Sequence, residues 1–232
     1  MPEPFAIEIS PGAEVTGLHY SSESALPGGP LLILAHGAGA DQRHAFMTGT
    51  AQRLAQRGVA VVTFDFLYTA RQRRMPDRPD VLEETWRAVL ARVRARAGDA
   101  PIFAGGKSMG GRIASQVASD PSIGRTLCGL VFLGYPLHPP GKPAQLRSKH
   151  LPHVTAPMLF VQGAKDPFGT EEEMRPLVQS LPGADLFVVA LGDHSFHVPK
   201  KAGVTGSQVS ASVEDEIARW IARTERRQGS PA

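Results

Sequence analysis

Three side chains in this sequence have the chemistry for nucleophilic attack on an acyl group: Ser108, Asp166 and His194. A serine hydroxyl is a weak nucleophile until an imidazole removes its proton, and a carboxylate can orient that imidazole and stabilise its positive charge. The residues occur in the order Ser, Asp, His, each just after an apolar run. We therefore predict a nucleophile, an orienting acid and a general base. Taken singly, Asp166 and His194 would be ordinary polar loop residues.

The strongest local pattern surrounds Ser108. Residues 106–110 are Gly-Lys-Ser-Met-Gly, which matches G-x-S-x-G, with an apolar run at 101–106 before them and a helical pattern at 110–119 after them. A tight turn between strand and helix projects the hydroxyl away from the backbone and holds the serine in strained φ and ψ. It also leaves no room for side chains at the flanking positions, which explains the glycines. The alternative is a glycine-rich turn in which the serine only caps the helix.

A second glycine-rich segment could complete the site. Residues 36–40 are His-Gly-Ala-Gly-Ala and follow the apolar run at 31–35. Small residues let the backbone approach a substrate closely, and N–H groups at the start of a helix favour a developing negative charge. We predict that the N–H groups of Ala38 and Met109 stabilise an oxyanion.

Four further residues are possible lining residues of a substrate site: Gly37, Gly39, Lys107 and His138. The two glycines are also alternatives to Ala38 as oxyanion donors, and Lys107 is either a surface residue or one that tunes local charge. We expect His36 to order its loop, because it precedes the nucleophile in the chain. His197 is a substitute for His194 as base, whereas Asp193 is a poor orienter because it adjoins His194.

The elements that must position these residues alternate along the chain. Period-two patterns at 5–10 and 14–20 predict an opening hairpin or two edge strands, followed by a Ser/Gly/Pro-rich loop at 21–30. Short apolar runs predict buried strands at 31–35, 59–64, 101–106, 127–134, 157–163 and 184–190. Helical patterns lie at 44–57, 81–97, 110–119, 171–180 and 209–221. We predict an α/β fold with a doubly wound, mostly parallel sheet, whose carboxyl edge gathers the polar residues.

Length and composition fit one globular domain. The chain has 232 residues, of which 42% are hydrophobic and 20% charged, and shows no repeat or linker. We predict a single domain over 1–232, with edge strands and a loop at 1–29 and a frayed tail at 228–232. No apolar run approaches the ~18–20 residues of a membrane span, no secretory signal pattern is visible, and Cys128 is the one cysteine. We expect no membrane contact, no disulfide framework and a cytoplasmic location.

The charge distribution and the absence of other motifs bear on which partners the protein binds. Net charge is +3, and the basic runs at 71–74 and 92–96 lack interleaved aromatic residues. They are better explained as a loop and solvated helix faces than as a nucleic-acid surface. No metal-ligand spacing, G-x-G-x-x-G or P-loop is present. We expect no metal, no cofactor and no nucleic acid. The expected partner is a small-molecule ester or acyl substrate; the sequence does not decide between monomer and homodimer.

Over nearly its whole length the chain resembles the α/β-hydrolase superfamily. The resemblance rests on LLILAHGAGA, GGKSMGG, VQGAKDPFG and GDHSF. More narrowly, GGKSMGGR and GYPLHPPGKP are similar to the small hydrolase-like domain shared by a testis-expressed protein and a subunit of the NSL acetyltransferase complex. They are also similar to bacterial dienelactone-hydrolase-like proteins. The resemblance implies a Ser108–Asp166–His194 triad, with Ala38 and Met109 as oxyanion donors.

Many superfamily members insert a cap domain after the sixth core strand, but here the connection at 135–157 is short and proline-rich. We therefore expect a lidless, open site. The favoured function is a serine hydrolase that cleaves a carboxylic ester or thioester through a Ser108 acyl-enzyme. One alternative is a non-catalytic binding or scaffold protein, because some relatives sit in larger assemblies. A small peptidase is less favoured, because no propeller or cap is present to select peptides.

Overall fold

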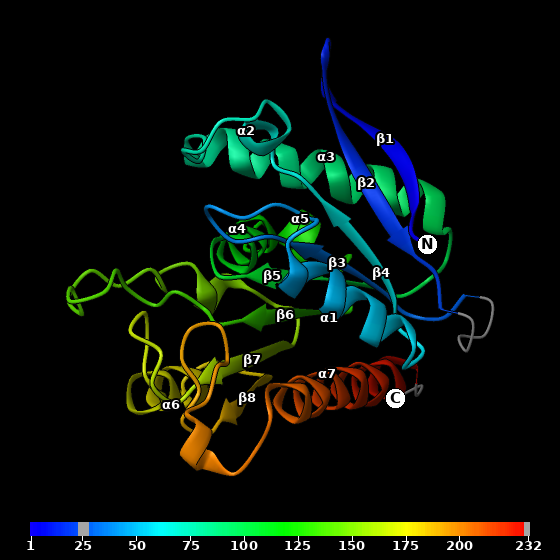
Figure 1. The fold of residues 1–232 in the computed structure, drawn as a ribbon. Coiled ribbons are helices and arrows are strands. Elements are labelled where there is room, and N and C mark those ends of the chain that lie inside the picture. Colours follow the sequence, from blue (N-terminus) through cyan, green and yellow to red (C-terminus); the bar gives the residue numbers. More distant parts are fainter. Residues whose placement is uncertain (23–27, 230–232) are drawn as a thin grey trace.

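The computed structural model of the chain describes residues 1–22 and 28–229. Within this part, eight strands form one sheet in the order β1-β2-β4-β3-β5-β6-β7-β8 (Figure 1). The strands are β1 Glu3–Ser10, β2 Ala13–Tyr20, β3 Leu31–Ala35, β4 Ala60–Phe64, β5 Ile102–Lys107, β6 Gly129–Leu133, β7 Met158–Gly163 and β8 Ala184–Val189. Pairing is parallel among β3 to β8 and antiparallel for β1 with β2 and for β2 with β4. The predicted α/β class and mostly parallel sheet are confirmed.

The opening hairpin is present, but only one of its strands lies at the edge. β2 pairs with β4 from Gly17 opposite Phe64 to Tyr20 opposite Val61, so β2 is an inner strand. The prediction of two edge strands is therefore wrong for the second one. Of the loop predicted at 21–30, residues 23–27 lie outside the described part of the chain.

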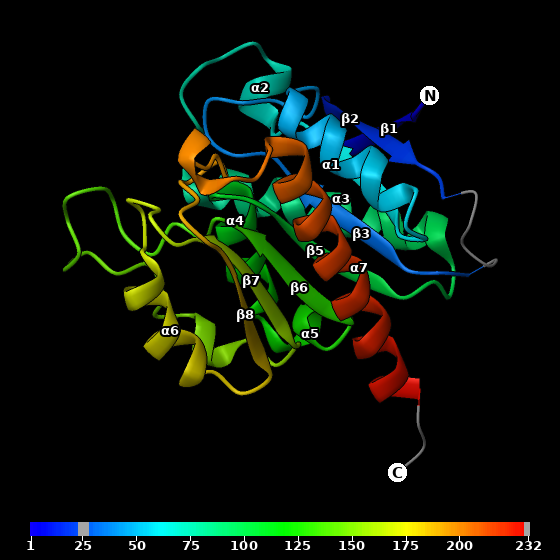
Figure 2. The ribbon, with the colours of Figure 1, turned by 60° about the horizontal axis from the view of Figure 1, so that its bottom comes forward.

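Helices cover both faces of the sheet (Figure 2). They are α1 Ala45–Ala55, α2 Leu67–Ala70, α3 Pro79–Ala97, α4 Met109–Ala118, α5 Pro121–Gly124, α6 Glu171–Gln179 and α7 Gly206–Gly229, with 3₁₀ turns at Leu151–His153 and Lys200–Ala202. The four-residue helices α2 and α5 were not predicted, because one turn is too short to show a period. α7 includes residues 228 and 229, which the sequence assigned to the tail, and residues 230–232 lie outside the described part.

The two helical layers explain why the central strands are continuously apolar. All five residues of β3 are buried. Its Ile33 packs into the core under α3, α4 and α6, whereas Leu32 and Leu34 pack into the core under α1 and α7. Trp86 of α3 and Trp220 of α7 are among the largest side chains in these two cores. A strand covered on both faces has no solvated side, so alternation disappears and a rigid platform results.

The register of this platform brings separate loops together. β3 pairs with β5 from Leu31 opposite Ile102 to Ala35 opposite Gly106, so the two strands end side by side. The segment after β3 therefore begins next to Ser108. The connection between β6 and β7 contains one short 3₁₀ turn and no cap domain within the described residues. Figure 1 shows it as a projecting green loop beyond the strand ends.

Candidate active site

Ser108 occupies a strained turn between β5 and α4. Its φ is 50° and its ψ is −116°, a conformation that costs a side-chain-bearing residue on the order of 1–3 kcal/mol. A Cβ at Gly106 would lie 2.4 Å from the Ala35 carbonyl oxygen, and one at Gly110 would lie 2.5 Å from the same atom. The glycines are therefore required by the backbone of β3 as well as by the turn. Ser108 makes no side-chain cap bond to α4, so the capping alternative does not describe this serine.

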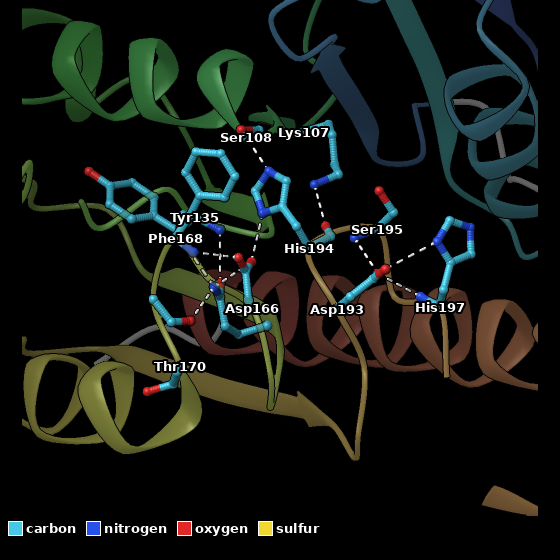
Figure 3. Close-up of polar contacts among 12 residues, drawn as sticks. Lys107, Ser108, Tyr135, Asp166, Phe168, Thr170, Asp193, His194, Ser195 and His197 are labelled. Atoms are coloured by element: carbon cyan, nitrogen blue, oxygen red, sulfur yellow. Dashed lines mark hydrogen bonds and ion pairs between the residues drawn. The ribbon is translucent and has the colours of Figure 1, made fainter. Parts of the chain in front are cut away.

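The structure brings Ser108, His194 and Asp166 into one hydrogen-bonded chain (Figure 3). His194 Nδ1 lies 2.7 Å from Asp166 Oδ2, and His194 Nε2 lies 2.9 Å from Ser108 Oγ. A carboxylate only accepts, so Nδ1 carries the proton and Nε2 is left to accept from the serine hydroxyl. The Phe168 ring lies against the imidazole with centroids 4.3 Å apart, which restricts its rotation.

Asp166 is fully buried, and its charge is balanced by hydrogen bonds. Oδ1 accepts from the Phe168 N–H at 2.8 Å, and Oδ2 accepts from Gln162 Nε2 at 2.9 Å as well as from His194. Gln162, itself fully buried, also donates to the Gly169 carbonyl and accepts from the Tyr135 N–H, each at 2.8 Å. The sequence analysis missed Gln162 as a positioning residue. The available signal was an amide inside the otherwise apolar strand β7.

Gly163, at the end of β7, lets the aspartate and histidine loops meet. A Cβ there would lie 2.2 Å from the Asp193 carbonyl oxygen. Asp193 shapes the histidine loop, because its Oδ1 accepts from the N–H groups of Ser195 at 2.8 Å and His197 at 2.9 Å. Asp193 therefore bonds its own loop rather than orienting His194. His197 is exposed and pairs with Asp193 at 3.3 Å, and no hydrogen bond joins its ring to Ser108 among the described residues.

Lys107 is much less exposed than a surface lysine. Its Nζ donates to the His194 carbonyl oxygen at 2.5 Å and lies within 6 Å of the ring centroids of Phe46 and Phe196. Burial lowers the pKa of Lys107 to about 8, although the carboxylates of Asp166 and Asp193 act in the opposite direction. The lysine thus ties the nucleophile turn to the histidine loop.

The segment after β3 is built around His36, which is fully buried. Its Nδ1 lies 2.8 Å from the Gly37 carbonyl oxygen, and its Nε2 accepts from the Phe66 N–H at 3.2 Å. Burial lowers the pKa of His36, which favours the neutral ring that these contacts need. His36 lies in contact with this loop and with Phe66 rather than with Ser108, as its predicted role in ordering the loop requires.

The predicted oxyanion donors flank Ser108. Met109 is the first residue of α4, and first-turn N–H groups have no partner inside a helix. Ala38 and Met109 line the same cavity as Ser108, and a Cβ at Gly37 would lie 3.5 Å from Ser108 Cβ. No backbone acceptor engages the N–H of Ala38 or Met109 within the described chain. Their role as oxyanion donors stays a prediction.

Ser108 and His194 open into a cavity of about 1010 Å³. Gly37, Gly39 and Lys107 line it, as predicted for a substrate site. His138 does not, so that expectation is wrong. The His138 side chain is buried beside Glu173, with its Nε2 3.1 Å from Glu173 Oε1, and its Nδ1 lies 2.9 Å from the Pro139 carbonyl oxygen. The proline-rich loop turns the imidazole away from the cleft, which sequence proximity did not reveal.

Residues 29–222 match the family described as "Alpha/beta hydrolase domain". The chain belongs to this family of α/β hydrolases. Within the described residues of this α/β hydrolase, no helix is long and apolar enough to cross a membrane. No group of three His, Cys, Asp or Glu side chains placed to hold a metal ion occurs in the same part of the chain.

Solved structures share the fold of this α/β hydrolase at low sequence identity. An α/β serine hydrolase homologue from Coxiella burnetii is 19% identical, with a TM-score of 0.73 over 94% of this chain and 96% of that one. A dienelactone hydrolase from Anabaena variabilis is 20% identical, with a TM-score of 0.73 over 96% and 98%. A serine hydrolase without lid from Xanthomonas campestris is 17% identical, with a TM-score of 0.69 over 99% and 97%. These similarities support the lidless architecture.

Proposed function

We propose that this α/β hydrolase is a serine hydrolase that cleaves a carboxylic ester or thioester through an acyl-enzyme on Ser108. The observation that carries the proposal is the chain of hydrogen bonds from Ser108 through His194 to Asp166, at the wall of a cavity. Proteins similar in fold include an esterase domain from Rhodothermus marinus and a dienelactone hydrolase, which agrees with ester chemistry.

The geometry supports a two-step reaction. His194 Nε2 removes the hydroxyl proton as Ser108 Oγ attacks the substrate carbonyl, and the same nitrogen then protonates the departing alcohol or thiol. Water next attacks the acyl-enzyme, with His194 again acting as base, and releases the acid and free Ser108. Asp166 orients the imidazole and stabilises the imidazolium in both steps.

The negative charge of each tetrahedral intermediate needs donors that are already in place. In this proposal the N–H groups of Ala38 and Met109 supply them, and the start of α4 adds a partial positive charge. The strained turn at Ser108 also favours catalysis over a scaffold role, because a protein that only binds partners gains nothing from that conformation.

A fluorophosphonate probe tests the nucleophile directly. We expect one covalent adduct on Ser108 in the folded protein at neutral pH, found by mass spectrometry of peptides. Ser108→Ala should lose the adduct and reduce ester turnover by on the order of 10⁴–10⁶, with an unchanged circular dichroism spectrum. Ser210→Ala, which alters another serine of the same cavity, is the matched control and should keep both the Ser108 adduct and the ester turnover. Absence of labelling on folded wild-type protein would refute the proposal.

A matched pair of substrates tests whether the site accepts oxygen esters, thioesters or both. We expect a short acyl chain to be hydrolysed both from an oxygen ester and from a thioester, because His194 Nε2 can protonate either leaving group. Turnover is followed by release of the chromophoric alcohol or of the free thiol. Failure of both substrates, together with no probe adduct, would favour the non-catalytic alternative.

A further inference from the structure

Both acidic side chains that line the cavity, Asp77 and Glu214, are paired with an arginine. Glu214 is bound by Arg53 at 2.8 Å, and Asp77 is bound by Arg73 at 2.5 Å. Two other arginines line the same cavity, Arg112 and Arg147, and neither has a carboxylate within 4.0 Å among the described residues. The cavity is therefore lined by two arginines that no acidic side chain neutralises, in addition to Lys107, which is bonded to the His194 carbonyl oxygen.

Arg112 is fixed close to the proposed nucleophile. It lies one turn along α4 from Ser108, and its backbone N–H donates to the Ser108 carbonyl oxygen at 3.1 Å. One terminal nitrogen donates to Gln116 Oε1 at 3.1 Å, whereas the Nε is buried and has no hydrogen-bond partner in the described chain. Burial, and secondarily the positive charge of Arg147, lowers the pKa of Arg112.

Arg147 reaches the cavity from a different element, the connection between β6 and β7. Its backbone is held at both ends: the N–H donates to the Leu137 carbonyl oxygen at 2.8 Å, and the carbonyl oxygen accepts from the Tyr135 hydroxyl at 2.8 Å. Tyr135 is itself buried in the core. The guanidinium lines the cavity and makes no hydrogen bond or ion pair with any described residue, so its donors are available to a ligand.

Two arginines that repel each other in a partly buried cavity reduce the stability of the fold unless an anion lies between them. A guanidinium presents a planar fork of donors that matches the oxygens of a carboxylate or a phosphate. A buried donor such as the Arg112 Nε also loses free energy until it finds an acceptor. Both the charge and the unused donors therefore favour a planar or tetrahedral oxyanion as ligand.

We propose that Arg112 and Arg147 form an anion subsite that selects esters carrying a second, negatively charged group, either a carboxylate or a phosphate. The inference rests on the proposed hydrolase function, because it names the class of substrate that the Ser108 site accepts. The charged group is held next to α4 while the ester carbonyl lies at Ser108. Esters without such a group leave both arginines desolvated and unpaired, and are poorer substrates.

Substrates matched in length test the subsite. We would compare three p-nitrophenyl esters: neutral valerate, the monoester of glutaric acid, and 4-phosphonobutyrate. We expect kcat/KM to be at least tenfold higher for one or both charged esters than for valerate, and the preferred charged ester identifies the anion. Arg147→Met should lower the ratio of kcat/KM for charged over neutral ester by roughly 10- to 100-fold. Arg147→Lys should recover part of the ratio, because it keeps the charge and loses the fork.

The control is Arg125→Met, an exposed arginine outside the cavity, which should leave the ratio at the wild-type value. A wild-type enzyme that hydrolyses valerate at least as well as both charged esters would overturn the subsite and leave the hydrolase proposal standing. An equal loss on neutral and charged esters in Arg147→Met would also overturn it.

A binding measurement separates the two proposals. Titration calorimetry of Ser108→Ala with glutarate and with inorganic phosphate should show binding of at least one of them that Arg147→Met removes. Neutral glutaramide should not bind. If no ester is turned over but this anion binding is seen, the hydrolase proposal fails and the subsite stands. If neither anion binds, the subsite fails whatever the turnover.

Discussion

The buried Lys107 gives the sharpest quantitative prediction. Its ammonium lies between the nucleophile turn and the histidine loop, and burial lowers its pKa from 10.5 to about 8. Between these two values the unfolded chain still holds the proton and the folded protein has released it. Because stability rises with pH wherever the unfolded state binds more protons, the protein gains stability from this group as pH rises from 8 to 10.5.

The size of the gain follows from the two pKa values. At pH 7 both states are protonated and the contribution is negligible. At pH 10 the folded state is almost fully deprotonated, whereas most unfolded chains are still protonated, and linkage gives a gain of about 2.5 kcal/mol. Lys107→Met removes the group, so the free energy of unfolding of wild type minus that of the variant should increase by this amount between pH 7 and pH 10.

Urea denaturation of both proteins at pH 7, 8, 9 and 10 measures the difference. All other titrating groups are common to the two proteins and cancel in the subtraction. Lys142→Met, at an exposed position of the loop after β6, is the matched control, and its difference from wild type should stay constant with pH. A constant difference for Lys107→Met as well would show that its ammonium is not desolvated, and would refute the reasoning.

Three other substitutions test the framework of the site. Gln162→Leu should lower kcat, because Asp166 loses a hydrogen-bond donor. It should also lower the free energy of unfolding in urea by on the order of 2–4 kcal/mol, because two backbone groups stay buried and unpaired. An unchanged kcat would contradict the positioning role. Gly106→Ala should prevent formation of the turn around Ser108 and yield no soluble active protein. Gly141→Ala, with open space around it, should lower the free energy of unfolding by about 1 kcal/mol. A folded, active Gly106→Ala would contradict the packing argument. Burial and the neighbouring Arg112 lower the pKa of His150 to about 4, so between pH 6.5 and 4 only the unfolded chain takes up this proton. His150→Gln should therefore lose less stability than wild type over this range. Parallel plots of unfolding free energy against pH for the two proteins would contradict this.

The sequence by itself determined the scaffold and the order of the chemistry. Apolar runs of five to eight residues that alternate with amphipathic segments predict a parallel sheet covered by helices on both faces. The G-x-S-x-G pattern at 106–110 marked the turn because a serine between two glycines, at a strand–helix junction, is a local signal. Asp166 and His194 could be predicted because each follows a strand, and strand ends meet at one edge.

Only the tertiary structure decided how those groups are held and what surrounds them. Gly163 matters because β7 and the histidine loop approach within contact distance, and Gln162 matters because its amide oxygen accepts from the Tyr135 N–H. Each is a relation between segments about 30 residues apart. Whether Lys107 is exposed, whether His138 faces the cleft and whether Arg147 lies near Arg112 depend on loop paths set by long-range packing. Local patterns record which faces of the chain avoid water, whereas the burial and pairing of a particular charge depend on distant segments that have no period in the sequence.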